Sequence, residues 1–170
     1  GVKERNAESL FGAIADELEK DGITLIPATT FLDDQMAGEG HLFGPQLKER
    51  DWDDVRFGQR IVKETSALDI GQSIVVRRGT VLAVEAFEGT AECIKRGGGL
   101  GNGTDVTLVK VSKPNQDMRF DVPVIGPKTI DSCREAGVGT IAVEAGKTLF
   151  LGLEEIEAKC VKGKITVVGF

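Results

Sequence analysis

Short β-branched runs alternate with segments of helical periodicity along this chain, and that alternation constrains the fold more than any other feature. The apolar runs are SIVVR, TVLAVEA, VTLVKV, TIAVEA, TLFL and ITVVGF, all between Ser73 and Phe170. Apolar residues at helical spacing, with capping and stop residues, predict helices over about 7–20, 51–68, 90–96, 127–136 and 154–161. Strands and helices in alternation predict one α/β domain with a mixed β-sheet flanked by helices, preceded by a helical, linker-like segment.

The predicted division is residues 1–68 as helical linker and start of the domain, and 69–170 as the domain proper. Within the first part, Ile23–Ile26 is expected to form a short buried strand, and Thr29–Arg50 a long surface connection. Two interpretations apply to GGGLGNG at 97–103: a mobile surface loop, or backbone amides that cradle an anion.

Composition excludes several classes of function. The net charge of −6 disfavours nucleic acid as a partner. Three widely spaced cysteines predict buried free thiols in a reducing cytoplasm, and no apolar run is long enough to span a membrane. With His41 as the only histidine, a metal would be a hard cation such as Mg²⁺, held by carboxylates.

The most informative segment is KPNQDMRFDVP, which places Lys113, Gln116, Asp117, Arg119 and Asp121 within nine residues. In an extended chain alternate residues share a face, so both aspartates and the arginine would point the same way. Paired carboxylates suit Mg²⁺ or a general base, and Arg and Lys complement phosphate oxygens. The alternative is a salt-bridged surface loop in which Arg119 pairs with both aspartates.

Polar residues also mark strand ends and a helix start. Glu85, Glu88 and Glu144 follow apolar strands, whose carboxyl ends face the ligand crevice of open α/β sheets. Each could equally be a turn carboxylate that accepts backbone amides. Asp69 and Gln72 lie at a corner between helix and strand, and the helix start at 126–129 is a favourable place for phosphate.

The longer motifs have a family likeness. DIGQSIVVRRGTVLAVEAFEGT, LVKVSKPNQDMRFDVPVIGPKTI, GVGTIAVEAG and the terminal VVGF resemble the LpxI-type UDP-2,3-diacylglucosamine pyrophosphatases, densely from Asp69 to Phe170 and more loosely upstream. The resemblance implies a magnesium-dependent hydrolase of lipid A biosynthesis. Its reaction would convert UDP-2,3-diacylglucosamine to UMP and 2,3-diacylglucosamine 1-phosphate (lipid X).

The resemblance also implies site residues. The family's essential aspartate belongs to the KPNQDMRFDVP stretch, where Asp117 is favoured and Asp121 is the second candidate. The expected catalytic residues are Asp117, Asp121 and Arg119, and the expected metal ligands are Asp117, Asp121, Glu85 and Glu88. The expected substrate-binding residues are Lys113, Gln116, Gln72, Thr90, Gly126 and Thr129. The family usually has an acidic residue where this chain has Ala91, which removes any ligand role at that position.

Two further alternatives follow from the resemblance. The family's N-terminal Rossmann-like domain has no counterpart here, so we expect a fragment or a short version, either an enzyme or a module that only binds lipid X or nucleotide sugar, or dimerises. A lipid substrate implies a cytoplasmic protein in peripheral contact with the inner membrane. Whether the chain forms a homo-oligomer is left open by the sequence. Phe87, Met118, Phe120 and Val122 would line an acyl groove or belong to the core.

Overall fold

The computed structural model describes residues 7–114 and 116–170, and in this part of the chain a six-stranded mixed sheet forms the centre. Its strands are β1 (Gly40–Phe43), β2 (Ser73–Arg77), β3 (Thr80–Val84), β4 (Val106–Lys110), β6 (Val138–Val143) and β8 (Thr166–Gly169). The helices are α1 (Ala7–Lys20), α2 (Glu49–Ala67), α3 (Thr90–Leu100), α4 (Pro127–Ala136) and α5 (Leu153–Gly163), with a 3₁₀ turn, η1, at Asp33–Gln35. A small parallel pair, β5 (Val124–Ile125) and β7 (Leu149–Phe150), completes the fold.

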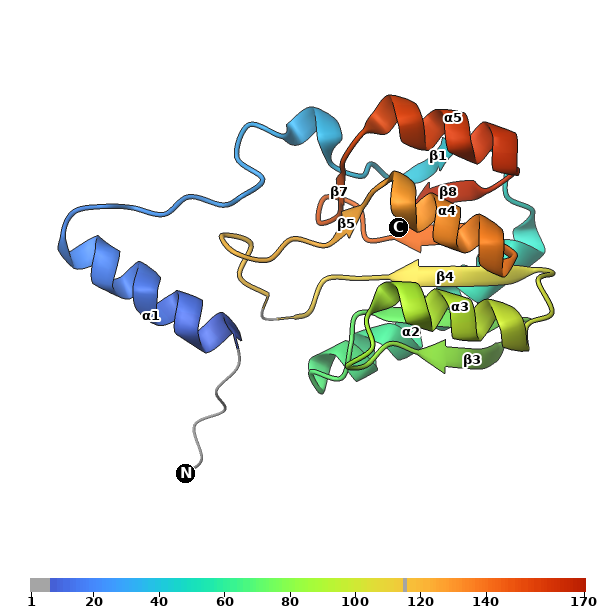
Figure 1. Cartoon of the computed structure of the whole chain (residues 1–170), viewed down its shortest axis with the longest axis horizontal. Helices are drawn as coiled ribbons and strands as arrows, with labels where there is room; N and C mark the ends of the chain where they lie inside the picture. Colours follow the sequence, from blue (N-terminus) through green and yellow to red (C-terminus); the bar gives the residue numbers. More distant parts are fainter. Residues whose placement is uncertain (1–6, 115) are drawn as a thin grey trace.

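The strand order is β1-β8-β6-β4-β2-β3, with β4, β6 and β8 mutually parallel and the other neighbours antiparallel (Figure 1). The α/β prediction with a mixed sheet is confirmed. Because β2 runs against β4, Ser73 at the start of β2 is paired with Lys110 at the end of β4. The carboxyl ends of the parallel strands, the start of β2 and the end of β3 therefore meet at one edge of the sheet.

Two apolar layers enclose the sheet. Helix α2 covers one face, and its Val55 and Val62 pack against the side chains of Ile74 and Val109. Helices α3, α4 and α5 cover the other face, where the three cysteines lie buried as free thiols, as predicted. Successive strand residues point to opposite layers. Because both layers are apolar, the strands are continuous hydrophobic runs in the sequence.

The glycine-rich segment begins as helix and not as a loop or an anion cradle, since α3 continues to Leu100. Gly97 and Gly98 are buried, and their missing side chains allow close packing. A Cβ on Gly97 would lie 2.5 Å from the Cβ of Val75, and one on Gly98 would lie 2.2 Å from the carbonyl oxygen of Ala136. Both predictions for residues 97–100 are wrong, because these glycines bring α3 against β2 and α4.

Helix α1 stands apart from the sheet in Figure 1, joined to it by the segment that follows Lys20. The expected strand at Ile23–Ile26 is not formed, and the side chains of Ile23 and Ile26 are about half exposed. The Phe11 ring stacks on that of Phe120 with centroids 5.4 Å apart, so α1 contacts the loop that follows β4. In the described residues, no helix is long and apolar enough to cross a membrane.

Candidate functional site

Four segments with predicted site residues meet at the edge of the sheet where β4 and β6 end. Backbone hydrogen bonds join them: the N–H of Val111 donates to the carbonyl of Gln72 (2.9 Å) and that of Glu85 donates to Ser73 (2.9 Å). The N–H of Glu144 donates to Lys110 (3.2 Å). We call this region the polar edge and define it as residues 69–73, 85–90, 110–114, 116–121 and 144. Motifs far apart in sequence thus contribute to one surface.

Gly71 explains how two of these segments approach so closely. A Cβ at this position would lie 2.1 Å from the carbonyl oxygen of Glu85, which only a glycine avoids. The turn before β2 therefore packs directly on the end of β3. Asp69, in the same turn, accepts a hydrogen bond from the ammonium of Lys113 and so ties the turn to the loop after β4.

The loop after β4 is held by its own side chains. The Lys113 N–H donates to Oε1 of Gln116 (2.8 Å), whose Nε2 donates to Oδ2 of Asp121 (2.6 Å). The N–H groups of Phe120 and Asp121 both donate to the carbonyl of Asp117 at 3.0 Å. Residues 117–121 thus form a turn, and the expectation of an extended chain with alternate residues on one face is wrong.

Arg119 pairs with Asp117 through two parallel hydrogen bonds. Its Nε lies 3.0 Å from Oδ1 and its terminal nitrogen lies 2.7 Å from Oδ2. These side-chain bonds, followed by one from the Arg119 N–H, lower the pKa of Asp117 below its ordinary range. The described structure gives no such pair between Arg119 and Asp121, so the salt-bridge interpretation holds for Asp117 alone.

A buried charged cluster lies beneath this loop. Glu85 and Lys110 are each 7% exposed, and Thr90 connects them: its hydroxyl donates to Oε1 of Glu85 (2.8 Å) and accepts from Nζ of Lys110 (3.3 Å). Nζ also lies 3.5 Å from the carbonyl oxygen of Val124. The hydroxyl of Ser73 lies 3.5 Å from that of Thr90. The cluster is therefore built from residues at the end of β3, in the first turn of α3, and in β4 and β5.

Hydrogen bonding at the polar edge is incomplete. Oε2 of Glu85, in this cluster, and Oε1 of Gln72, before β2, are both buried without a donor among the described residues. Burial lowers the pKa of Lys110, while the charges of Glu85 and Asp121 oppose that shift. Buried polar atoms without partners are uncommon in folded proteins and call for an explanation. Here, two acceptor oxygens and one cation lie at the predicted site.

Glu144 holds the start of the loop from the other side. Its carboxylate accepts from Nζ of Lys63 in α2 (2.7 Å) and from the N–H (2.9 Å) and hydroxyl (2.8 Å) of Ser112. Burial acts to raise its pKa, but these donors outweigh burial and lower the pKa to about 2. Glu144 is therefore a carboxylate that accepts backbone and side-chain donors, which agrees with the turn interpretation.

Glu88 is also occupied by protein donors. Its Oε1 accepts from Arg96 (2.6 Å) and its Oε2 from the N–H of Ala86 (3.1 Å). Hydrogen bonds from its own backbone N–H and from Arg96 lower its pKa. A metal ion would have to displace these donors, so Glu88 is poorly suited as a metal ligand.

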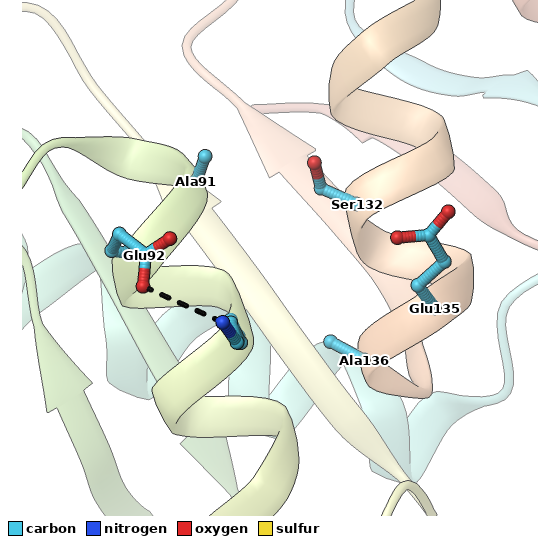
Figure 2. A pocket seen from close by; sticks show the side chains of 6 residues that line it. Ala91, Glu92, Ser132, Glu135 and Ala136 are labelled. Carbon is cyan, nitrogen blue, oxygen red and sulfur yellow. Dashed lines mark ion pairs between the residues drawn. The ribbon is translucent and has the colours of Figure 1, made fainter.

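Two adjoining cavities lie between α3 and α4. One, of about 190 Å³, is lined by Thr90, Ala91, Ile94, Lys128, Thr129 and Ser132, from the first two turns of both helices. The other, of about 380 Å³, shares Ala91 and Ser132 and continues past Glu92, Lys95, Glu135 and Ala136 (Figure 2). Gly126 is the N-cap of α4. The predicted residues Thr90, Gly126 and Thr129 are thus brought to the same place.

The apolar candidates do not belong to the core. Phe87 is fully exposed at 106%, and Phe120 is partly exposed and contacts both Phe11 and the guanidinium of Arg119. Met118 and Val122 are partly exposed as well. Leu68 and Ile70, which are also exposed, lie just before the turn at Gly71. The core interpretation of these residues is wrong.

Sequence reasoning missed Lys110, Ser112 and Lys63. Lys110 had a visible signal, because a lysine stands within VTLVKV, an otherwise apolar strand with both faces covered. Ser112 and Lys63 had none, since their roles depend on where Glu144 lies. Among the described residues, no group of three or more His, Cys, Asp or Glu side chains is arranged to hold a metal ion.

Comparison with known proteins agrees with these motifs. The family model of the LpxI C-terminal domain matches residues 38–168, which is most of the chain. The chain belongs to the LpxI C-terminal domain family. It is 32% identical over 158 residues to a Caulobacter vibrioides protein named UDP-2,3-diacylglucosamine pyrophosphatase LpxI. That alignment covers 89% of this chain and 56% of the relative, so the chain spans just over half of the LpxI protein that it matches.

Proposed function

We propose that the chain takes part in lipid A biosynthesis as a hydrolase that cleaves the diphosphate of UDP-2,3-diacylglucosamine to UMP and lipid X. The name of the Caulobacter relative supports the substrate and the reaction. The observation that carries the proposal is the polar edge, where Glu85 and Thr90 of one segment and Lys113, Asp117 and Asp121 of another lie at the same end of the sheet, with Thr90 lining a cavity. An apolar rim of exposed side chains at the same edge suits a substrate with two acyl chains.

We propose Mg²⁺ as the cofactor. Apart from the two glutamates that protein donors already occupy, the polar edge has four carboxylates and three cations: Asp69, Glu85, Asp117 and Asp121 against Lys110, Lys113 and Arg119. Without a further cation this set would have a net charge of −1, which is unfavourable for a diphosphate. Mg²⁺ usually takes only one or two protein carboxylates and completes its shell with phosphate oxygens and water. The absence of a three-carboxylate cluster in the described residues is compatible with that mode.

The donor set favours two of the predicted ligands. Among the described residues, Oε2 of Glu85 has no donor and Asp121 accepts a side-chain hydrogen bond only on Oδ2, from Gln116. Asp117 and Glu88 already accept hydrogen bonds on both oxygens. We therefore assign Glu85 and Asp121 as the residues that would hold the ion. When bound, Mg²⁺ would neutralise charge that develops on the phosphoryl oxygens.

The other residues bind and orient the substrate. Asp117 fixes the plane of the Arg119 guanidinium, which presents its remaining N–H groups to a phosphate oxygen. Thr90, Thr129 and the first-turn amides of α3 and α4 bind the diphosphate at the smaller cavity, helped by the helix dipoles. Lys113, Gln116 and Gln72 bind substrate from the loop side, and Gly126 contributes as the N-cap of α4.

The test is release of UMP from UDP-2,3-diacylglucosamine by the purified chain with Mg²⁺, comparing wild type with Asp117→Asn and Asp121→Asn. Both variants should lose at least 100-fold in kcat while circular dichroism and thermal unfolding show an intact fold. Glu155→Gln, which neutralises an exposed carboxylate on α5, is the control for charge removal and should keep full activity. Wild-type turnover by both Asp117→Asn and Asp121→Asn would reject the assignment.

A second candidate is a module that binds lipid X or nucleotide sugar, or dimerises, without turnover. It is favoured by one observation, that the chain spans 56% of the length of its Caulobacter relative. Calorimetry with lipid X and with UMP, on the preparation used for the hydrolysis assay, separates binding from catalysis. UDP-GlcNAc, which lacks the acyl chains, tests whether the substrate is a simpler nucleotide sugar. If UDP-GlcNAc were cleaved as efficiently as the acylated substrate, the assignment of a lipid substrate would be wrong.

We further propose that the protein works in the cytoplasm, in peripheral contact with the inner membrane. Its three buried free thiols suit a reducing compartment, and burial raises the pKa of Cys93 to about 12, which keeps that thiol protonated. The exposed side chains of Leu68, Ile70 and Phe87 beside the polar edge would face the lipid surface from which the substrate comes. Sedimentation with vesicles of anionic phospholipid, compared between wild type and Phe87→Ser, tests this.

A further inference from the structure

Lys110 is a charged residue of the polar edge whose burial is not explained by the roles described above. It is 7% exposed and lies at the end of a central strand, where a lysine costs free energy because its ammonium leaves water. Its two protein acceptors among the described residues, Thr90 Oγ1 and the Val124 carbonyl, lie at 3.3 and 3.5 Å, and neither is a carboxylate. An ammonium has three donors, so these long contacts leave hydrogen-bonding capacity unused.

Thr90 connects Lys110 to the cavity. It is the first residue of α3, and its side chain lines the smaller cavity while its hydroxyl accepts from Nζ of Lys110. That hydroxyl has one proton, which it donates to Glu85, so toward Lys110 it can only accept. The two hydrogen bonds together fix the orientation of the hydroxyl. Lys110 therefore sets how Thr90 is held at the wall of the cavity.

The position of Lys110 also matters for charge. It lies behind the first turn of α3, on the side of the sheet that α3 and α4 cover, so its charge acts in a region with little water. Among the described residues, the charges of Glu85 and Asp121 act on it. Its positive charge offsets these two carboxylates, which would otherwise repel the phosphoryl oxygens of a ligand in the cavity.

The geometry points to Lys110 as a further positioning residue of the diphosphate site: it holds Thr90 at the cavity between α3 and α4 and supplies positive charge behind it. The inference rests on the proposed function, because that function places the diphosphate at this cavity. It assigns to Lys110 a role in binding the phosphoryl groups and not in the chemical step. Its loss should therefore raise KM more than it lowers kcat.

The first test is Lys110→Met, which removes the charge and keeps a side chain of similar length. We expect a KM for UDP-2,3-diacylglucosamine at least tenfold higher, a change in kcat below threefold, and at least tenfold weaker binding of inorganic pyrophosphate without divalent cation. Lys162→Met, which removes an exposed charge from α5, is the matched control and should change neither value. Thr90→Ser should retain most of the affinity and Thr90→Val should lose it, because only serine keeps the hydroxyl.

Lys110→Met leaves the carboxylate of Glu85 buried without its cation, and this variant can fail to fold for that reason alone. A second comparison avoids the problem: Glu85→Gln is compared with the double variant Glu85→Gln/Lys110→Met, in which neither charge is left alone. Pyrophosphate affinity, measured by calorimetry without metal, should be at least tenfold weaker in the double variant than in Glu85→Gln. A purely structural role for Lys110 predicts equal affinities once both proteins are folded.

The outcomes separate this inference from the proposed function. If wild type releases UMP and removal of Lys110 changes KM and pyrophosphate affinity less than twofold, the inference is wrong and the function stands. If wild type releases no UMP but removal of Lys110 still weakens pyrophosphate binding, the function is wrong and the phosphate-binding role stands. No binding of pyrophosphate by wild type would overturn the role as well.

Discussion

Replacing Glu144 with glutamine tests how the loop after β4 is held in place. The carboxylate of Glu144 accepts from Nζ of Lys63 and from the N–H and hydroxyl of Ser112, the residue that begins the loop. A glutamine at this position would keep the shape of the side chain but lose the charge. Its NH₂ group, a donor, would also replace an oxygen that accepts hydrogen bonds from Lys63 or Ser112. The loop would lose its anchor on the α2 side, and the protein would lose stability.

The magnitude follows from the pKa of Glu144, which is about 2 in the folded protein against an ordinary value of 4.5. Each pKa unit corresponds to about 1.4 kcal/mol, so the charged form is favoured by about 3 kcal/mol. The side chain is 13% exposed, which limits screening by water and salt. Because the folded pKa is depressed, this stability is present above about pH 4.5 and is lost as pH falls toward 2.

Urea unfolding at pH 7 and at pH 3 measures the effect. At pH 7, Glu144→Gln should be about 2–3 kcal/mol less stable than wild type. At pH 3 wild type has itself lost about 2 kcal/mol of this contribution, so the difference should shrink to about 1 kcal/mol. The control is Glu155→Gln, since Glu155 is 62% exposed and forms only a 3.5 Å ion pair with Lys159. That change should cost less than about 0.5 kcal/mol at either pH.

Two results would refute this reasoning. A loss at pH 7 no larger than that of Glu155→Gln would show that the donors of Lys63 and Ser112 do not stabilise the charge of Glu144. A loss that is large but equal at pH 7 and pH 3 would show that packing of the side chain, and not its ionisation, is responsible.

Three further predictions concern stability and the metal. Asp54→Ala should cost about 2–4 kcal/mol in urea unfolding, because its buried carboxylate accepts the N–H groups of Arg78 and Gly79 at 2.7 Å each; an effect below about 0.5 kcal/mol would contradict an anchoring role for it. Gly97→Ala should lower the melting temperature, because its Cβ would overlap a strand side chain, whereas Gly99→Ala, with open space around it, should leave it unchanged or raise it; equal shifts would argue against close packing. Removing divalent cations with EDTA should abolish UMP release and added Mg²⁺ should restore it, and activity that persists in EDTA would exclude the proposed cofactor.

Local sequence signals are sufficient for most of the sheet and its helices. Arg78-Gly79 predicts the hairpin between β2 and β3, and both residues have positive φ, 48° and 70°, as a tight hairpin turn needs. Helix α4 begins at Pro127 and ends before Gly137, whose φ is 74°. In both cases a few residues restrict the backbone by themselves, so tertiary context is not needed to find them.

Other features depend on contacts that the sequence does not display. Gly97 and Gly98 have loop-like composition, but the side chain of Val75 and the backbone of Ala136 leave room only for glycine in a helix. Ile23–Ile26 has strand composition, yet it has no partner strand in the described structure. Composition describes a segment by itself, whereas in these two segments the backbone conformation depends on which residues pack against it in the fold.

The candidate site shows the same division. The motif residues are recognisable one by one, and the ends of the parallel strands predict that they lie close together. The turn at Asp117–Asp121 and the pairing of Arg119 with one aspartate are not predictable, because they depend on hydrogen bonds to the Asp117 carbonyl and carboxylate. Lys110 is noticeable in the sequence as a lysine within an apolar strand. It becomes informative only once the structure shows that this strand is buried.

The central claim is that the polar edge and the first turns of α3 and α4 bind the two products of diphosphate cleavage. The most direct measurement is amide chemical-shift mapping of the isotopically labelled chain during titration with UMP and lipid X in the presence of Mg²⁺. The account predicts saturable shifts confined to residues 69–73, 85–95, 110–114 and 116–132. Shifts confined to the opposite end of the sheet, around residues 101–105, or no shifts at saturating product, would contradict it.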